Sequence, residues 1–270
     1  MKDPKSQPTA FSPLAYKNEK FIDSDDARPL RILAEYLEPM HRFAHLDIRG
    51  TVVFFGSARL AADGPLGRYY EDARTLARLV TMWSSTLPAA KGRLLVCTGG
   101  GGGIMEAANR GAADAGGRTI GFNISLPEEQ HSNPYVTPEL SFEFRYFFMR
   151  KLWFAHMARA IVVFPGGFGT LDEMSEILTL AQTRKLDRRI TMLLYGTSYW
   201  KEIINFEALV RHGMISKEDM DLFHFADDPQ SAHSLLTEGL TADLQAPSPA
   251  FARSRTSQNS NTWLYQRSGD

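Results

Sequence analysis

Three apolar runs of strand length are each followed by a turn sequence and then by a helical pattern. The first run is Thr51–Phe55 and leads to Gly56, and the second, Arg93–Cys97, leads to a glycine cluster. The third, Ala160–Phe164, leads to Pro165 and two glycines. Runs that are apolar at nearly every position indicate strands buried on both faces, as in a parallel sheet covered by helices.

Strand-like and helix-like patterns alternate along most of the chain. The expected strands are 51–55, 93–97, 118–124, 139–144, 160–164 and 190–195, and the expected helices are about 66–84, 103–115, 146–158, 171–185 and 199–211, with a further helix beginning at Pro29. This alternation predicts an α/β fold with a single doubly wound, Rossmann-like, mostly parallel sheet and helices on both faces. We expect one domain at 28–240, a polar N-terminal extension at 1–27 and a polar C-terminal tail at 241–270.

Composition narrows the class of protein. With 270 residues, 43% of them hydrophobic, the chain can bury one sizeable core, and its net charge of −1 gives no basic field for a nucleic-acid polymer or an anionic membrane. The lone Cys97 cannot form an internal disulfide, and the polar start Met1–Lys5 is unlike a signal peptide. We therefore expect a cytoplasmic protein. The seven histidines show no metal-ligand spacing, so no metal or cofactor is expected.

The segment Pro-Gly-Gly-Phe-Gly-Thr-Leu-Asp-Glu, at 165–173, carries the strongest chemical signal. A glycine turn between a strand and a helix directs free backbone N–H groups and the positive end of the helix dipole at one spot. Gly166, Gly167, Gly169 and Thr170 are therefore candidates for holding a phosphate. Glu173 adds a carboxylate beside that anion, which suggests catalysis. The alternative is that Thr170 and Glu173 form a capping box and only begin the helix.

Two further glycine turns end neighbouring strands. Gly99–Gly103 matches neither the spaced-glycine dinucleotide fingerprint nor a Walker loop. Because the carboxyl ends of parallel strands meet at one edge of a sheet, we expect these turns to share a crevice. Ser57, Gly100 and Gly101 are then candidates for lining it. The alternative is that these residues only permit tight turns.

These segments together resemble the LOG family, the cytokinin riboside 5′-monophosphate phosphoribohydrolases, which are often mislabelled lysine decarboxylases. Residues 165–173 match the family signature PGGxGTxxE, and Met149-Arg150-Lys151 is similar to its upstream Arg-Lys pair. Gly56-Ser57 and Gly99–Met105 resemble its other two turns, so that the resemblance covers roughly residues 50 to 212. The chain is similar in particular to the longer bacterial members and to the core of the purine/pyrimidine nucleotide nucleosidases.

The resemblance implies hydrolysis of the N-glycosidic bond of a nucleoside 5′-monophosphate to free base and ribose 5-phosphate. It implies that Glu173 acts on the sugar, that Arg150 is catalytic or positions the substrate, and that Lys151 contributes to phosphate binding. It also implies a homodimer or larger homo-oligomer, and it leaves the base open among purines, pyrimidines and prenylated adenine.

Alternatives come from other classes of protein. Without the family match, Arg150 and Lys151 fit a solvated or salt-bridged helix face. A non-catalytic nucleotide or molybdenum-cofactor carrier of the same fold is the main rival to the enzyme. A pyridoxal phosphate decarboxylase would need a lysine for an internal aldimine, and the sequence singles none out.

Overall fold

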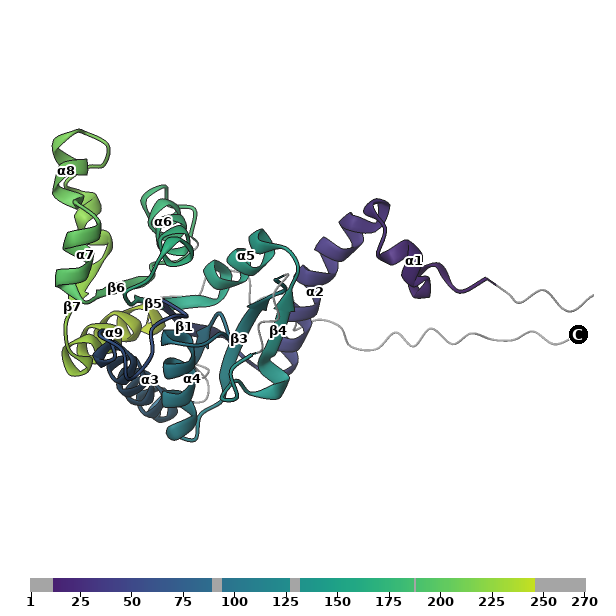
Figure 1. Ribbon diagram of the computed structural model, residues 1–270, viewed down its shortest axis with the longest axis horizontal. Coiled ribbons are helices and arrows are strands. Elements are labelled where there is room, and N and C mark those ends of the chain that lie inside the picture. The colour runs from purple at the N-terminus through teal and green to yellow at the C-terminus, as the bar shows by residue number, and fades with distance from the viewer. Residues whose placement is uncertain (1–11, 89–93, 127–131, 187, 246–270) are drawn as a thin grey trace, which may run out of the picture.

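A computed structural model describes residues 12–88, 94–126, 132–186 and 188–245 (Figure 1). Their centre is a sheet of seven strands in the order β4-β3-β2-β1-β5-β6-β7. All neighbouring strands run parallel, with Val53 opposite both Cys97 and Ile161 at the centre. The prediction of a doubly wound parallel α/β sheet is confirmed.

The strands and helices alternate as the sequence pattern predicts. The strands are β1 (Gly50–Phe55), β2 (Leu94–Thr98), β3 (Thr119–Ile124), β4 (Ser141–Phe144), β5 (Ala158–Val163), β6 (Thr191–Tyr195) and β7 (His224–Ala226). The helices are α1 (Glu19–Ile22), α2 (Arg28–His45), α3 (Arg68–Thr86), α4 (Ile104–Asp114), α5 (Phe147–Met157), α6 (Phe168–Gln182), α7 (Thr197–Ile203), α8 (Phe206–Arg211) and α9 (Pro229–Gln245).

Side chains of β1 alternate between two hydrophobic layers, one on each face of the sheet. Val53 and Phe55 pack into the layer that includes side chains from α2, α5, α6, α7 and α8. Val52 and Phe54 pack into the layer with α3, α4 and α9. Figure 1 shows α3, α4 and α9 together below the sheet, while α5, α6 and α7 rise on the other side. Burial on both faces explains why β1 is apolar at successive positions.

Two regions differ from the sequence prediction. The helix expected at 199–211 is two helices, because Ile204 is extended and the Asn205 side chain accepts a hydrogen bond from the N–H of Ala208 at 2.8 Å, starting α8 anew. Strand β7 and helix α9 were not predicted. Helix α9 runs to Gln245, across the boundary expected after residue 240.

The polar extension expected at 1–27 is partly described. From residue 12 onward it contains short 3-10 turns and α1, whereas residues 1–11, like 246–270 of the expected tail, lie outside the described residues. Over the described part of the chain, no helix is long and apolar enough to cross a membrane.

Helix α2 carries large apolar side chains on its outer surface. It extends beyond the sheet toward α1 (Figure 1). Leu30, Leu33, Leu37 and Met40 are each between two fifths and one half exposed. Their spacing of three or four residues places them on one side of the helix.

Candidate active site

The turn after β1 holds the other two glycine loops together. The N–H of Ser57 donates to the carbonyl oxygen of Pro165 at 3.0 Å, and the carbonyl oxygen of Ser57 accepts from the N–H of Ile104 at 3.1 Å. Pro165 begins the loop before α6, and Ile104 is the first residue of α4. The three glycine turns predicted from the sequence therefore adjoin at the carboxyl edge of the sheet.

The start of α6 presents free backbone donors. Within the described residues, the N–H groups from Gly166 to Thr170 have no acceptor, and the first helical bond runs from Leu171 to the carbonyl of Gly167 at 3.0 Å. Gly167 is the N-cap and receives no side-chain cap. A capping box between Thr170 and Glu173 does not form, because Thr170 already lies inside the helix. This geometry is that of an anion site at a helix N-terminus.

Gly166 is required by close packing. A Cβ atom at this position would lie 2.1 Å from the Thr170 hydroxyl oxygen, whereas one at Gly167 would meet nothing within 4 Å. The loop thus keeps the buried Thr170 side chain against the backbone of Gly166. Tyr199 fixes the loop from the other side, since its hydroxyl donates to the Gly166 carbonyl at 2.8 Å.

Glu173 and Arg150 form an ion pair in the interior of the site. A guanidinium nitrogen, Nη2, lies 3.1 Å from the Glu173 Oε1 atom, and the two side chains are 14% and 13% exposed for Glu173 and Arg150 respectively. Burial raises the pKa of Glu173 from 4.5 to about 7, while Arg150 acts to lower it. The Nε atom of Arg150 is buried and has no hydrogen-bond partner among the described residues.

Aromatic rings and the second glycine loop surround Arg150. Its guanidinium carbon lies 5.2 Å from the centre of the Phe147 ring and 5.8 Å from that of Phe154. A Cβ atom placed on Gly99 would lie 3.9 Å from its Nη1 atom, so the end of β2 and this cation are neighbours. Burial raises the pKa of the Cys97 thiol, and the nearby Glu173 charge raises it further, so that Cys97 has no nucleophilic character.

Lys151 is held by carboxylates. Its amino group lies 3.0 Å from both carboxylate oxygens of Asp172 and 3.1 Å from Glu176. The pairing agrees with the salt-bridged helix face that was the alternative for this residue. Its contribution to phosphate binding stays a prediction. No cluster of three or more His, Cys, Asp or Glu side chains suited to a metal occurs in the described ranges.

A buried polar network fixes the glycine loop after β2. The Asn133 amide donates to the carbonyls of Gly100 and Gly101 at 3.1 and 3.0 Å and to the Asn109 side chain at 2.9 Å. Thr98 donates to the same Asn109 oxygen at 2.7 Å. Gly100 itself has a φ of +74°, in the left-handed region that favours glycine. Sequence reasoning missed both asparagines, because Asn133 reaches this loop from beyond β3.

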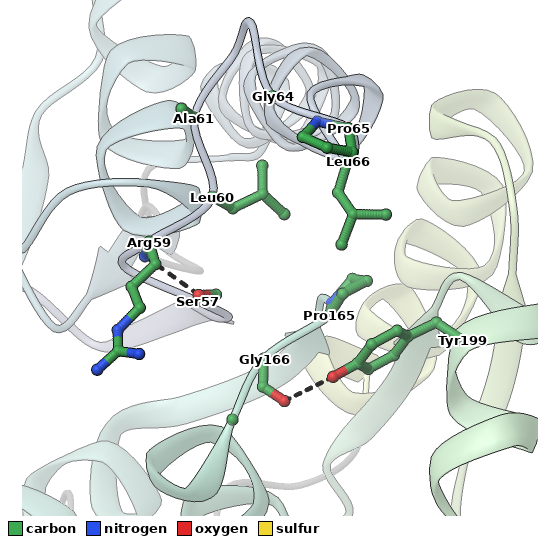
Figure 2. A pocket seen from close by; sticks show the side chains of 11 residues that line it. Ser57, Arg59, Leu60, Ala61, Gly64, Pro65, Leu66, Pro165, Gly166 and Tyr199 are labelled. Atoms are coloured by element: carbon green, nitrogen blue, oxygen red, sulfur yellow. Dashed lines mark hydrogen bonds between the residues drawn. The ribbon is translucent and has the colours of Figure 1, made fainter.

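A pocket of about 420 Å³ opens beside the Pro165–Gly167 loop (Figure 2). Most of its wall is apolar, with the ring of Tyr199 on one side. The lining residues are Ser57, Arg59, Leu60, Ala61, Gly64, Pro65, Leu66, Pro165, Gly166, Gly167 and Tyr199. Of these, Ser57, Gly166 and Gly167 were predicted site residues. The contribution of residues 59–66, later in the β1–α3 loop, was not foreseen, because nothing in that part of the sequence resembles a ligand-binding pattern.

Comparison with known proteins identifies relatives. The family model described as possible lysine decarboxylase matches residues 105–236. The probable cytokinin riboside 5′-monophosphate phosphoribohydrolase LOG4 of Oryza sativa subsp. japonica is 30% identical over 146 residues. These residues span 53% of this chain and 62% of the rice protein.

Two solved structures have a similar arrangement. The X-ray structure of TM1055, a structural genomics target, matches with a TM-score of 0.50 at 21% identity, covering 70% of this chain and 99% of its own. A molybdenum cofactor carrier protein from Chlamydomonas reinhardtii has a TM-score of 0.49 at 21% identity, covering 72% and 99%. At this level of identity, the likeness to TM1055 shows a shared fold alone. The family model and the rice relative show that the chain is similar to the LOG family over these residues.

Proposed function

We propose that this protein hydrolyses the N-glycosidic bond of nucleoside 5′-monophosphates and releases the free base and ribose 5-phosphate. The observation that carries the proposal is the buried pair of Glu173 and Arg150 beside a helix N-terminus with free N–H groups. An anion site alone has no use for a carboxylate whose pKa lies near neutral pH. Similarity to the LOG family supports the same reaction class.

The 5′-phosphate would bind at the start of α6. The N–H groups of Gly166, Gly167, Gly169 and Thr170 have no acceptor among the described residues, and the helix dipole favours a negative charge there. The Thr170 hydroxyl would add a hydrogen bond. Binding energy from this remote group would hold the sugar in place, so a nucleoside without phosphate should lose rate as well as affinity.

Glu173 would act at the anomeric carbon. The sugar becomes oxocarbenium-like as the C1′–N bond breaks and its electron pair moves to the base nitrogen. The Glu173 carboxylate would stabilise that positive charge and accept a proton from the attacking water, while the departing nitrogen takes a proton from solvent. A pKa of about 7 suits a general base near neutral pH. Arg150 would hold the carboxylate in position, with its unpartnered Nε available to the sugar or phosphate.

We also propose that the protein works as a homo-oligomer. The exposed apolar side of α2, formed by Leu30, Leu33, Leu37 and Met40, supports this proposal. An apolar stripe of this length on a projecting helix is typical of a subunit interface.

The test is base release from AMP, GMP, CMP, UMP, IMP and isopentenyl-AMP, with ribose 5-phosphate measured in parallel. Glu173→Gln should reduce release by at least about a hundredfold, in line with the loss of a general base. Glu238→Gln is the matched control, because Glu238 is exposed on α9, across the sheet. It should leave release unchanged.

Two outcomes would contradict the proposal. One is tight binding of nucleotides without release of base from any of them, which would favour the carrier. The other is release that survives Glu173→Gln. Equal turnover of adenosine and AMP would contradict the phosphate anchor separately.

A further inference from the structure

The pocket in Figure 2 lies directly beside the expected phosphate site. Gly166 and Gly167 belong to both, since they line the pocket and carry free N–H groups at the start of α6. A ligand whose anionic end is held at these glycines therefore has the pocket within reach for its other end. The volume, about 420 Å³, lies within the range of roughly 300–1,000 Å³ that is usual for small-molecule sites.

Much of the pocket wall is apolar. Figure 2 shows the side chains of Leu60 and Leu66 directed into it, with Pro165 and the Tyr199 ring opposite, while the Arg59 side chain extends away. A flat, weakly polar group between aliphatic side chains and an aromatic ring has favourable contact on both of its faces.

The two side-chain hydroxyl groups in the pocket wall already take part in hydrogen bonds. The Tyr199 hydroxyl donates its proton to the Gly166 carbonyl at 2.8 Å, and the Ser57 hydroxyl oxygen accepts from the N–H of Arg59 at 3.1 Å. No carboxylate or carboxamide side chain is among the lining residues within the described part of the chain. The wall therefore offers little that could distinguish the hydrogen-bonding edges of different heterocycles.

We propose that this pocket receives the base of the nucleotide and selects it by size and apolar contact, with Leu60 and Leu66 of the β1–α3 loop as specificity-determining residues. The inference rests on the proposed function, because it takes the phosphate to lie at α6. It implies hydrolysis of several bases, with differences that follow their size and apolar surface. An apolar substituent on the base would add contact with Leu66, which is 44% exposed at the rim.

Leu66→Trp tests this inference, because the larger ring would fill the rim without disturbing a buried position. We expect kcat/KM for AMP to fall at least about tenfold and the Kd of AMP, measured by calorimetry, to rise in parallel. Inhibition by ribose 5-phosphate, which has no base, should stay within about twofold of wild type. Leu66→Ala should lower kcat/KM for isopentenyl-AMP relative to AMP, because the contact between Leu66 and the apolar substituent is lost. The control is Leu209→Trp, a leucine 37% exposed on α8, outside the pocket.

Equal weakening of AMP and ribose 5-phosphate by Leu66→Trp would overturn the proposal, since the pocket would then hold the sugar phosphate. Unchanged binding of AMP would overturn it as well. The proposed reaction can fail separately: if wild type binds AMP without hydrolysing it, the comparison of Kd values for AMP and ribose 5-phosphate still decides the place of the base. If wild type binds neither, both proposals fall.

Discussion

Replacing Glu173 with glutamine removes a buried carboxyl group whose pKa burial raises from 4.5 to about 7, against the effect of Arg150. Each pH unit between two pKa values corresponds to about 1.4 kcal/mol of free energy. The folded protein therefore carries a penalty of about 3 kcal/mol for an ionised Glu173 relative to the unfolded chain. The penalty is absent below pH 4.5, where both states are protonated, grows as the pH rises through 7, and is constant above it.

Stability measured against pH gives the direct readout. Glutamine at this position stays neutral, so the free energy of unfolding of Glu173→Gln relative to wild type should increase by about 3 kcal/mol between pH 4.5 and pH 8. Urea titrations of the two proteins at half-unit intervals of pH would measure it. The absolute difference also contains the cost of leaving Arg150 buried without its carboxylate, but Arg150 stays charged throughout this range, so only the change with pH is diagnostic.

The rate should follow the same ionisation. If the carboxylate form is the active one, kcat/KM of wild type rises about tenfold from pH 6 to pH 8 and is level above that. A substrate phosphate also titrates near pH 6, so the stability series without substrate is the cleaner measurement. A stability difference that does not vary with pH would refute the claim that burial raises the pKa of this group. A rate profile with its midpoint near 4.5 would do the same.

Three further changes test other parts of the structure. Gly166→Ala should raise the Kd of ribose 5-phosphate more than tenfold, measured by calorimetry, and destabilise the fold by about 1–3 kcal/mol in urea titrations, because the added methyl group collides with Thr170. Gly167→Ala should change neither the Kd nor the stability, because a Cβ atom there meets no neighbour. Asn133→Ala should cost about 1–3 kcal/mol in urea titrations by leaving the buried Gly101 carbonyl without a donor, with a lower kcat. Leu37→Glu should shift the protein toward monomer in sedimentation velocity, and an unchanged mass would count against the α2 interface.

Much of the fold could be predicted because the central strands are buried on both faces. Thr51–Phe55 and Ala160–Phe164 have few polar positions, and an apolar run of this length followed by glycine indicates a strand of a parallel sheet. Strand β7 was missed because its three residues, His224–Ala226, are too few to show a period and lie at the sheet edge. The break between α7 and α8 had a local signal in Asn205, a typical N-cap residue.

The parts of the candidate site that could be predicted lie within the motifs that the sequence itself displays. The glycines that follow the apolar strands identify the three loops. The position of Glu173 just after the third loop identifies the carboxylate of the candidate site. The apolar pocket could not be predicted, because Leu66 and Tyr199 come from different loops and helices and nothing local distinguishes them from core residues. The same holds for Asn109 and Asn133, whose pairing depends on the strand order of the sheet.

The hydrogen bond from Ser57 to Pro165 joins loops from opposite halves of the domain. Closing the long chain between them costs conformational entropy before β1 and β5 can pair, so this pairing should be a late event in folding. During synthesis, β1 and β2 can pair early, but the crevice between the glycine loops has no second wall until β5 has left the ribosome. A nascent chain that stops before α6 would thus contain most of the sheet but lack the proposed phosphate site.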